Sequence, residues 1–264
     1  EISLGLVGSE MCIRDRAGRN KRLRRFSWKV IYRVAAVVLL LLLPLATYWQ
    51  GKEVVKHNFA DMVVEAPLGA RTKLYLPDGT LVWLNAGSKI VYSQGFGVDD
   101  RNLSLEGEGY FEVKRNEEVP FLVKTNSLLV KVLGTKFNFR DYPDDAEAIV
   151  SLSEGKVALN NLLKKEKEAF LLPNERVVLN KKNGRMHVEY STVSNALQWT
   201  NGYLFFDEEL LPDVVKELER SYNVKIQIAS DTLNTFRFYG NFVHREQNIQ
   251  EVLEALSATR KIHY

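Results

Sequence analysis

The sequence is poor in the residues from which disulfide frameworks, metal centres and most active sites are built. It contains one cysteine, Cys12, which excludes a disulfide within the chain, and its four histidines stand far apart. No G-x-S-x-G, H-E-x-x-H, P-loop or C-x-x-C motif occurs. The glycine pairs 95/97 and 107/109 lack the further glycines of a dinucleotide site. We therefore expect no catalytic residue, no cofactor and no metal, and we expect that the protein is not an enzyme.

The strongest indication of catalysis is a row of carboxylates within residues 103–113. In an extended strand Glu106, Glu108 and Glu112 share one face, and residues two apart lie roughly 6.5–7 Å apart, a separation found in glycoside hydrolases. No aromatic-rich groove accompanies them, and alternating glutamates are typical of a solvated strand face. A membrane-anchored glycosidase is thus a rival hypothesis, while the pattern itself predicts solvent-exposed carboxylates.

Long uncharged apolar runs are also scarce, and the exception lies between residues 30 and 49. Its centre, Val37 to Leu43, carries no charge, and about 20 residues is the length of helix that crosses the hydrocarbon of a bilayer. Arg33 lies one turn from the start, where its side chain can reach the headgroups, and Tyr48 and Trp49 suit the far interface. Pro44 is tolerated in membrane helices. The run predicts an uncleaved transmembrane helix.

Charge is distributed unevenly about this run. Residues 14–33 carry a net charge of +8 while the whole chain carries +3, so the remainder is at −5. By the positive-inside rule the N-terminus is cytoplasmic and the rest is exported. The basic cluster suits anionic lipid headgroups, whereas the acidic exported part argues against nucleic acid as a partner.

The segments flanking the helix carry little pattern. Residues 1–16 resemble a translated sequencing adaptor and are left out of the fold argument, and the orientation still rests on seven basic residues. Residues 17–29 are interpreted as a basic cytoplasmic remnant, and residues 50–66 as a tether.

The sequence pattern from residue 67 to 190 predicts an all-β domain, because short runs of alternating hydrophobicity are separated by turns rich in Gly, Asn and Asp. Pro77-Asp78-Gly79 predicts a tight hairpin turn. Trp83 is expected in the core rather than on a ligand platform, and Asp144-Asp145 is interpreted as a turn tip without enough ligands for calcium. Strands are expected over residues 72–76, 81–84, 103–113, 121–124, 128–133, 136–140, 148–152, 156–159, 176–179 and 187–189.

Residues 198–264 contain an internal duplication. A strand over 202–206, a helix opening at Pro212 and a strand over 224–228 recur, 38 residues later, as a strand over 236–242, a helical stripe over 249–256 and a strand beginning at 261. This predicts a small α+β domain of two βαβ units whose last strand is truncated. Its edges can recruit a partner by strand addition or pack on the β-domain. The stripe of Tyr203 and Phe205 is expected to belong to the core. The same two residues, together with Phe238 and Tyr239, are also the candidates for contact with a partner.

Four ordered stretches, Leu76–Ser88, Leu105–Val113, Pro120–Val123 and Val132–Phe139, resemble the FecR-type anti-sigma regulators. The segment from about Gln198 is similar to the C-terminal domain of Bacteroidetes members, which is related to the STN domain of secretins and TonB-dependent receptors. The positions that carry the resemblance are expected to be structural: Pro77, Asp78, Gly79, Trp83, Asn85, Gly107, Glu108, Phe111, Pro120, Phe121, Gly134, Thr135 and Phe137.

The resemblance implies signal transduction across the bacterial inner membrane. In such a relay the periplasmic part contacts the N-terminal periplasmic domain of a substrate-loaded, TonB-dependent outer-membrane transporter. A cytoplasmic domain then holds or releases an extracytoplasmic-function sigma factor and so regulates transcription. Two departures stand out: residues 17–29 leave too little for that cytoplasmic domain, so this chain as written is not expected to bind a sigma factor, and Asn174 replaces a usual glycine.

The alternative reading is a membrane-anchored periplasmic module that binds glycan or cell wall. The sequence leaves open the transported substrate, iron chelate or glycan, and whether the signal crosses the membrane by proteolysis or by a change in association.

Overall fold

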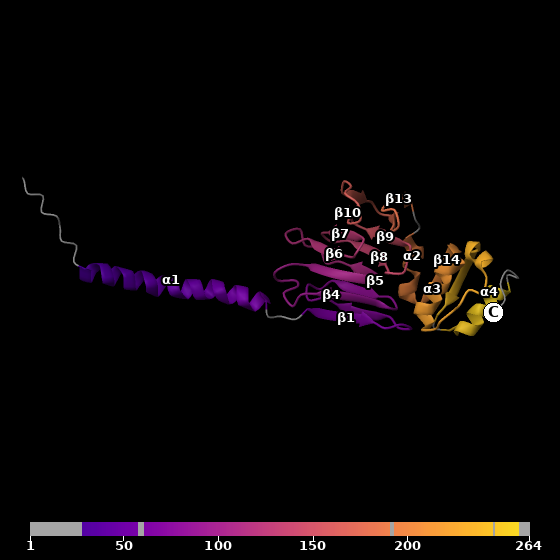
Figure 1. The fold of residues 1–264 in the computed structure, drawn as a ribbon, viewed down its shortest axis with the longest axis horizontal. Helices are drawn as coiled ribbons and strands as arrows, with labels where there is room; N and C mark the ends of the chain where they lie inside the picture. The colour runs from indigo at the N-terminus through magenta and orange to yellow at the C-terminus, as the bar shows by residue number, and fades with distance from the viewer. Residues whose placement is uncertain (1–27, 58–60, 191–192, 245, 259–264) are drawn as a thin grey trace, which may run out of the picture. The chain divides into compact units, whose positions relative to one another are not determined.

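A computed structural model describes residues 28–57, 61–190, 193–244 and 246–258. The chain divides after His57 into two compact units, and each is described by itself (Figure 1). The first unit contributes the helix α1 (Trp28–His57). Its window Ile31–Tyr48 has a mean hydropathy of 2.0 and none of it is buried, so the helix is long and apolar enough for a membrane anchor.

We expected residues 50–66 to form a tether, but both ends of this segment belong to regular secondary structure. The α1 helix continues to His57, because residues 52–56 contain Lys and Glu, which are good helix formers. Met62–Ala66 forms the strand β1, which pairs with β4. As an edge strand β1 leaves Met62 and Val63 exposed, so its sequence lacks the alternation of a half-buried strand.

Residues 62–190 form two β-sheets that share one long strand, β5 (Asn102–Glu112). In the first sheet β5 lies between β4 and β6, and in the second it lies between β3 and β8. All pairs are antiparallel except β5 with β6. The first sheet runs in the order β1, β4 (Ser88–Tyr92), β5, β6 (Phe121–Lys124), β7 (Leu128–Val132), β10 (Val157–Asn161), β11 (Ala169–Leu171). The second runs in the order β2 (Thr72–Tyr75), β3 (Leu81–Leu84), β5, β8 (Lys136–Asp141), β9 (Glu147–Glu154), β12 (Glu175–Asn180), β13 (Met186–Tyr190).

Gly107 is the point at which β5 passes from the first sheet to the second. Residues up to Glu106 pair with β4, and residues from Gly107 onward pair with β8. Its φ is +103°, and a Cβ there would lie 2.8 Å from the Cα of Ser88. Only glycine fits a positive φ at such a close backbone approach. This residue therefore makes the two-sheet arrangement possible.

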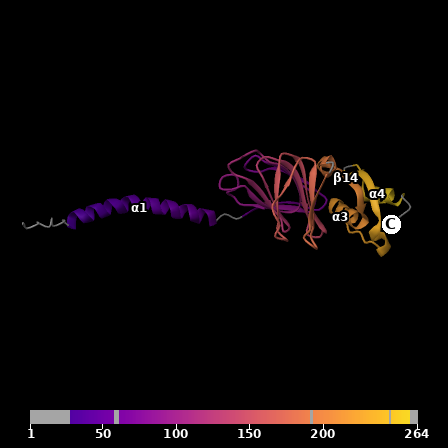
Figure 2. The same ribbon diagram turned by 90° about the horizontal axis from the view of Figure 1, so that it is seen from above.

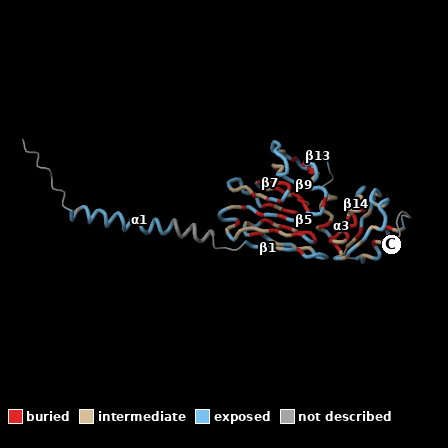
Figure 3. The backbone as a smooth tube through the Cα atoms, in the orientation of Figure 1, coloured by how far each residue is buried: buried red, intermediate tan, exposed pale blue. Residues whose placement is uncertain are grey.

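One apolar core fills the space between the two sheets (Figures 2 and 3). Phe111 in the second half of β5 stacks on Phe137 of β8, with ring centroids 5.1 Å apart. It also meets Phe121 of the first sheet edge-on at 6.1 Å, which is a favourable aromatic geometry. All three side chains are fully buried. The sheets are thus joined by packing as well as by β5.

The sequence predictions for this domain are largely confirmed, and the predicted hairpin turn is among them. The backbone N–H of Gly79 donates to Leu76 O at 2.9 Å, and Gly79 has a φ of +85°. Asn174 takes the positive φ of +67° expected for a glycine replacement. The strands β4 and β11 were not predicted. In β4 the polar Ser88 is buried at 1% exposure, which hides the alternation.

The C-terminal part consists of α2 (Val193–Ala196), η1 (Gln198–Asn201), β14 (Tyr203–Leu210), α3 (Leu211–Tyr222), η2 (Asp231–Thr235), β15 (Arg237–Val243) and α4 (Ile249–Ser257). Of the predicted strand–helix–strand duplication, the first strand and the helix are present in both repeats. Val214 of α3 and its counterpart Val252 of α4 are both fully buried in one apolar cluster. The next pair, Leu218 and Leu256, is buried in the same cluster, at 0% and 3% exposure. Pro212 lies in the first turn of α3, as predicted.

The predicted strand over residues 224–228 is wrong. Among the described residues the segment pairs with no strand, and the backbone N–H of Ile226 instead donates to the Glu219 carboxylate at 2.8 Å. Ile226 and Ile228 nevertheless pack against the apolar cluster, which explains their alternating pattern. The two strands β14 and β15 pair antiparallel, so two βαβ units are not formed within the described residues. The strand expected from residue 261 lies outside the described residues.

Candidate functional site

Charged side chains meet where α3 packs against the β-domain. Glu217 and Arg220 lie one turn apart on α3, beside the apolar stripe of that helix. They face Arg140 on β8 and Asp145 in the turn that follows it. We call these four residues the charge quartet. Each domain contributes one acid and one base, so the quartet spans the junction between them.

The quartet forms a closed ring of ion pairs. Glu217 Oε2 lies 3.1 Å from Arg140 Nη1 and 3.4 Å from Arg220 Nη2. Asp145 accepts from Arg140 Nε at 2.9 Å and from Arg220 Nη1 at 3.0 Å. The side chains of Glu217, Arg220 and Asp145 are at most 10% exposed, and that of Arg140 is 24% exposed. Charges this buried are stable only when each has its partners in place.

Glu108 on β5 extends this network into the β-domain. Its two carboxylate oxygens accept from the side-chain amides of Asn85 at 2.9 Å and Asn138 at 2.8 Å. The Trp199 indole N–H donates to Asn138 Oδ1 at 3.1 Å, which ties η1 to the same network. Asn85 Nδ2 also reaches Glu217 at 3.5 Å. The two domains are therefore linked by hydrogen bonds as well as by ion pairs.

The expectation that Glu106, Glu108 and Glu112 share a solvated face is wrong for Glu108, which is 4% exposed. The C-terminal part covers this stretch of the second sheet, where Trp199 and Glu217 approach it. Glu106 precedes the Gly107 pivot, pairs with β4 and stays exposed. The three carboxylates therefore occupy different environments.

The environment shifts the pKa of each acid in a definite direction. Burial raises the pKa of Glu108 above its ordinary 4.5, and Arg140 offsets this only in part. Burial acts on Glu217 and Asp145 in the same sense, but the nearby Arg140 and Arg220 outweigh it and lower the pKa of both acids. The quartet is therefore ionised at neutral pH, and of these three acids only Glu108 has a raised pKa.

Tyr142 closes the network on one side. The guanidinium carbon of Arg220 lies 3.9 Å from the centre of its ring, a cation–π contact. Its hydroxyl donates to Ala86 O at 2.9 Å and accepts from Ser88 at 3.2 Å. The backbone N–H of Gly69 donates to Arg220 O at 2.8 Å. These contacts fix the position of α3 on the loops at the end of the sheet.

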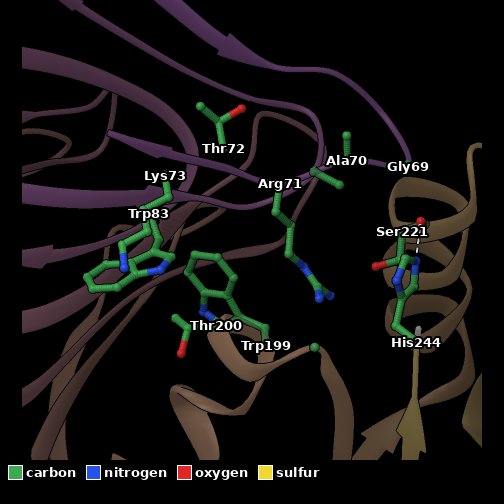
Figure 4. Close-up of a pocket in the computed structure, with 12 residues that line it drawn as sticks. Gly69, Ala70, Arg71, Thr72, Lys73, Trp83, Trp199, Thr200, Ser221 and His244 are labelled. Atoms are coloured by element: carbon green, nitrogen blue, oxygen red, sulfur yellow. Dashed lines mark hydrogen bonds between the residues drawn. The ribbon is translucent and has the colours of Figure 1, made fainter. Parts of the chain in front are cut away.

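A cavity of about 300 Å³ lies at the same junction (Figure 4). The β-domain supplies Arg71, Lys73 and Trp83 to its wall, and the C-terminal part supplies Trp199 and His244. Figure 4 shows the Arg71 guanidinium extending between Trp199 and His244. The residues that line the cavity, all within the described part of the chain, include no aspartate or glutamate. We call this cavity the basic pocket.

Most of the residues that carry the FecR resemblance have a structural place in the β-domain. Asp78, for example, forms a buried ion pair with Arg101, whose Nε lies 2.8 Å from Asp78 Oδ2. They are distributed as follows: Pro77, Asp78 and Gly79 in the β2–β3 turn, Trp83 on β3, Asn85 after it, Gly107, Glu108 and Phe111 on β5, Pro120 and Phe121 at the start of β6, Gly134 and Thr135 in the β7–β8 turn, and Phe137 on β8.

The aromatic side chains that were singled out from the sequence lie in environments that differ from the predicted ones. Trp83 is half-buried beside Tyr110 and lines the basic pocket rather than the core. On β14 the core residues are Leu204 and Phe206, so Tyr203 and Phe205 point the other way, and Tyr203 is 38% exposed. Phe238 is buried at 3% and is wrong as a partner contact. Tyr239 is 65% exposed and remains a candidate.

The charge quartet was missed by sequence reasoning. Asp145 was interpreted only as a turn tip, and the helical stripe of α3 drew attention to apolar residues alone. A signal was nevertheless available, because Glu217, Arg220 and Ser221 recur at the helical spacing that places them on one face. Their partner Arg140 stands 77 residues from Glu217 and has no such local signal.

Comparison with known proteins identifies the family. A model of the family described as "FecR protein" matches residues 62–158, and one described as "FecR, C-terminal" matches residues 203–264. A protein from Parabacteroides distasonis ATCC 8503, described as a candidate anti-sigma factor, has a crystal structure at 1.65 Å resolution. It is 33% identical, with a TM-score of 0.71, over 77% of this chain and 93% of that chain. The chain belongs to the FecR family of anti-sigma factors.

A second crystal structure at 2.50 Å resolution, also described as a candidate anti-sigma factor from that organism, agrees with the first. It has the same TM-score of 0.71 and identity of 33%, over 78% of this chain and 94% of that chain. A search among curated proteins returns no match. FecR anti-sigma factors are regulators and not enzymes, so the expectation that the chain is not an enzyme is confirmed, and the glycosidase hypothesis is wrong.

Proposed function

We propose that this FecR protein relays the substrate occupancy of a TonB-dependent outer-membrane transporter to an extracytoplasmic-function sigma factor in the cytoplasm. The family assignment supports an anti-sigma role, and the exposed apolar window of α1 suits an inner-membrane anchor. The basic cluster before α1 favours a cytoplasmic N-terminus, which leaves the β-domain and the C-terminal part in the periplasm.

The observation that carries the proposal is the junction between the two exported parts. The charge quartet joins α3 to β8 through buried ion pairs, so a partner that moves the C-terminal part must also disturb the β-domain. Buried ion pairs add little net stability over apolar packing but are costly to break singly. A junction of this kind therefore favours either the fully docked or the fully released arrangement.

The C-terminal part offers a surface for the transporter. Within the described residues β14 and β15 pair only with each other, which leaves a small sheet suited to strand addition. Tyr239 on β15 is 65% exposed and Tyr203 on β14 is 38% exposed. Tyrosine is enriched among the residues that dominate binding energy at protein interfaces.

The test is calorimetric titration of the full chain in nanodiscs with the N-terminal periplasmic domain of the transporter encoded nearest to it. We expect saturable binding that Tyr239→Ala weakens about tenfold or more, the effect of losing an interface hot spot. Tyr190→Ala, on β13 and 86% exposed, is the matched control and should bind as the parent does. Absence of binding between folded partners would refute the relay, and equal weakening by both variants would refute the assigned surface.

A further inference from the structure

The basic pocket has the composition of a small-ligand site rather than of a packing defect. A cavity of about 300 Å³ is at the lower end of the range for pockets that hold small molecules, roughly 300–1,000 Å³. Two indole rings and a few polar groups border it, which is the usual mixture of apolar wall and placed hydrogen-bonding groups. A pocket of this size suits a monosaccharide-sized ligand and not a polymer chain.

The charge of the lining selects an anion. Arg71 and Lys73 enter the pocket from one strand and its preceding loop, and no carboxylate lines the pocket within the described residues. The Lys73 ammonium lies 4.5 Å from the centre of the Trp83 ring, where it is exposed to solvent and accessible to a ligand. Arg71 Nε also donates to Asn85 Oδ1 at 3.0 Å, so part of its hydrogen-bonding capacity is already used. A carboxylate, which has two oxygens to satisfy, therefore fits the site better than a phosphate, which has more.

The polar groups select hydroxyls. The Nε2–H of His244 donates to the carbonyl oxygen of Ser221 at 2.7 Å, which leaves the other ring nitrogen, Nδ1, for a ligand. The hydroxyl of Thr200 donates to Leu197 O at 2.8 Å, which leaves its oxygen lone pairs to accept. Both groups thus offer hydrogen-bonding atoms at the pocket, and a sugar hydroxyl can meet each of them because it both donates and accepts. The apolar face of a pyranose ring suits the indoles of Trp83 and Trp199.

We propose that the basic pocket binds a small acidic sugar, a hexuronate, with its carboxylate on Arg71 and Lys73 and its ring against the two indoles. The site lies between the domains, so a ligand there contacts both and stabilises the docked arrangement by mass action. The regulator would then respond directly to a periplasmic solute. The inference does not depend on the transporter relay, because ligand binding is measured without the transporter.

The test is calorimetric titration of the full chain in nanodiscs with D-glucuronate, followed in parallel by tryptophan fluorescence. We expect one saturable site, weakened about tenfold by Lys73→Ala through loss of a charge-assisted hydrogen bond. Lys131→Ala is the matched control, because Lys131 is also exposed on a strand but lies on β7, outside the pocket lining. Lys73 is exposed, so its replacement leaves folding intact, whereas Arg71 also donates to Asn85 Oδ1 at 3.0 Å and is unsuitable as the sole variant.

Four further ligands test which chemical class of molecule the basic pocket binds. Neutral D-glucose, inorganic phosphate and benzoate should each bind more weakly than D-glucuronate. A disaccharide ending in glucuronate distinguishes an oligosaccharide end from the free sugar acid, and either source is consistent with the proposal. No saturable binding of either uronate at millimolar concentration would overturn it. Equal binding of glucose, phosphate or benzoate would overturn the carboxylate or the sugar assignment, and unchanged affinity of Lys73→Ala would overturn the site.

Discussion

The interior of the β-domain and its junction with α3 are both buried, but opposite chemistry holds them together. The interior is apolar, and Phe111, Phe121 and Phe137 lie fully buried between the two sheets. The junction is formed by the charge quartet, whose members depend on one another for charge compensation. Apolar packing is the sum of many small contacts, whereas separating one pair of a buried ion ring leaves an uncompensated buried charge. The β-domain is thus suited to a fixed shape and the junction to a conditional one.

The largest expected effect comes from breaking the interior. Phe111→Ala removes a ring that contacts both sheets and leaves a cavity that they cannot easily close. We expect the free energy of unfolding of the β-domain to fall by about 3–5 kcal/mol. Urea denaturation of the full chain, followed by far-ultraviolet circular dichroism, measures this. A loss below about 1 kcal/mol, the range for exposed substitutions, would contradict the assigned core.

The next effect comes from breaking the junction. Glu217→Gln removes one charge of the quartet and leaves Arg140 and Arg220 incompletely compensated. We expect docking to weaken by roughly 2–3 kcal/mol, at the low end of the range for a truncated buried pair because Arg140 is 24% exposed. Hydrogen exchange should accelerate in α3 and not in β5.

The control for this substitution lies on the same helix. The side chain of Asp213 is 40% exposed, so Asp213→Asn should leave the exchange of α3 nearly unchanged. Equal acceleration in both variants, or acceleration throughout the β-domain after Glu217→Gln, would contradict a junction that opens on its own.

The pH dependence sharpens the comparison, because the titrating groups described above lie in the junction. Asp145 and Glu217 have lowered pKa values, so their contribution is present above their ordinary 3.8 and 4.5 and is lost as the pH falls through the lowered values. Glu108 has a raised pKa, so its contribution is present below 4.5 and is lost as the pH rises through the raised value.

Docking should therefore be strongest on the acidic side of neutrality and collapse in stronger acid. The protection factor of the α3 amides, which is the intrinsic exchange rate at each pH divided by the measured rate, tests this between about pH 3 and 8. Asp145→Asn should reduce the loss of docking that occurs in acid. Phe111→Ala should leave the shape of the pH profile of α3 protection unchanged. A profile that is flat over the whole range would contradict the assigned role of these carboxylates.

The smallest effect is expected at the surface. Lys136 and Glu154 form an ion pair of 2.7 Å, but their side chains are 44% and 69% exposed. The hydrogen bond that Lys136 donates to the Glu154 carboxylate raises the pKa of Lys136, yet solvent screens most of the attraction. Lys136→Ala should change the free energy of unfolding by less than about 1 kcal/mol in the same urea titration. A larger loss would show that exposed charge pairs in this protein act as the buried quartet does.

Local pattern was sufficient for much of the fold. The repeat that pairs Val214 with Val252 and Leu218 with Leu256 predicted both helices, and the Pro77–Gly79 turn predicted the hairpin. The pattern failed at residues 224–228, where Ile226 and Ile228 pack against the apolar cluster and pair with no strand in the described part of the chain. It also failed for β1, an exposed edge strand whose pairing with β4 is not visible in its own residues.

The sequence by itself determined the apolar helix, the β-rich domain, the duplicated C-terminal helices and the family, because periodicity, turn chemistry and motif order are properties of neighbouring residues. Only the tertiary structure decided that Glu108 is buried, that Trp83 lines a pocket and that α3 is held by the charge quartet. The physical reason is distance along the chain: Arg140 and Glu217 are 77 residues apart, and Asp145 and Arg220 are 75 apart. A charge has no periodicity that reveals its partner, so whether it faces water or an opposite charge is set only when the domains pack.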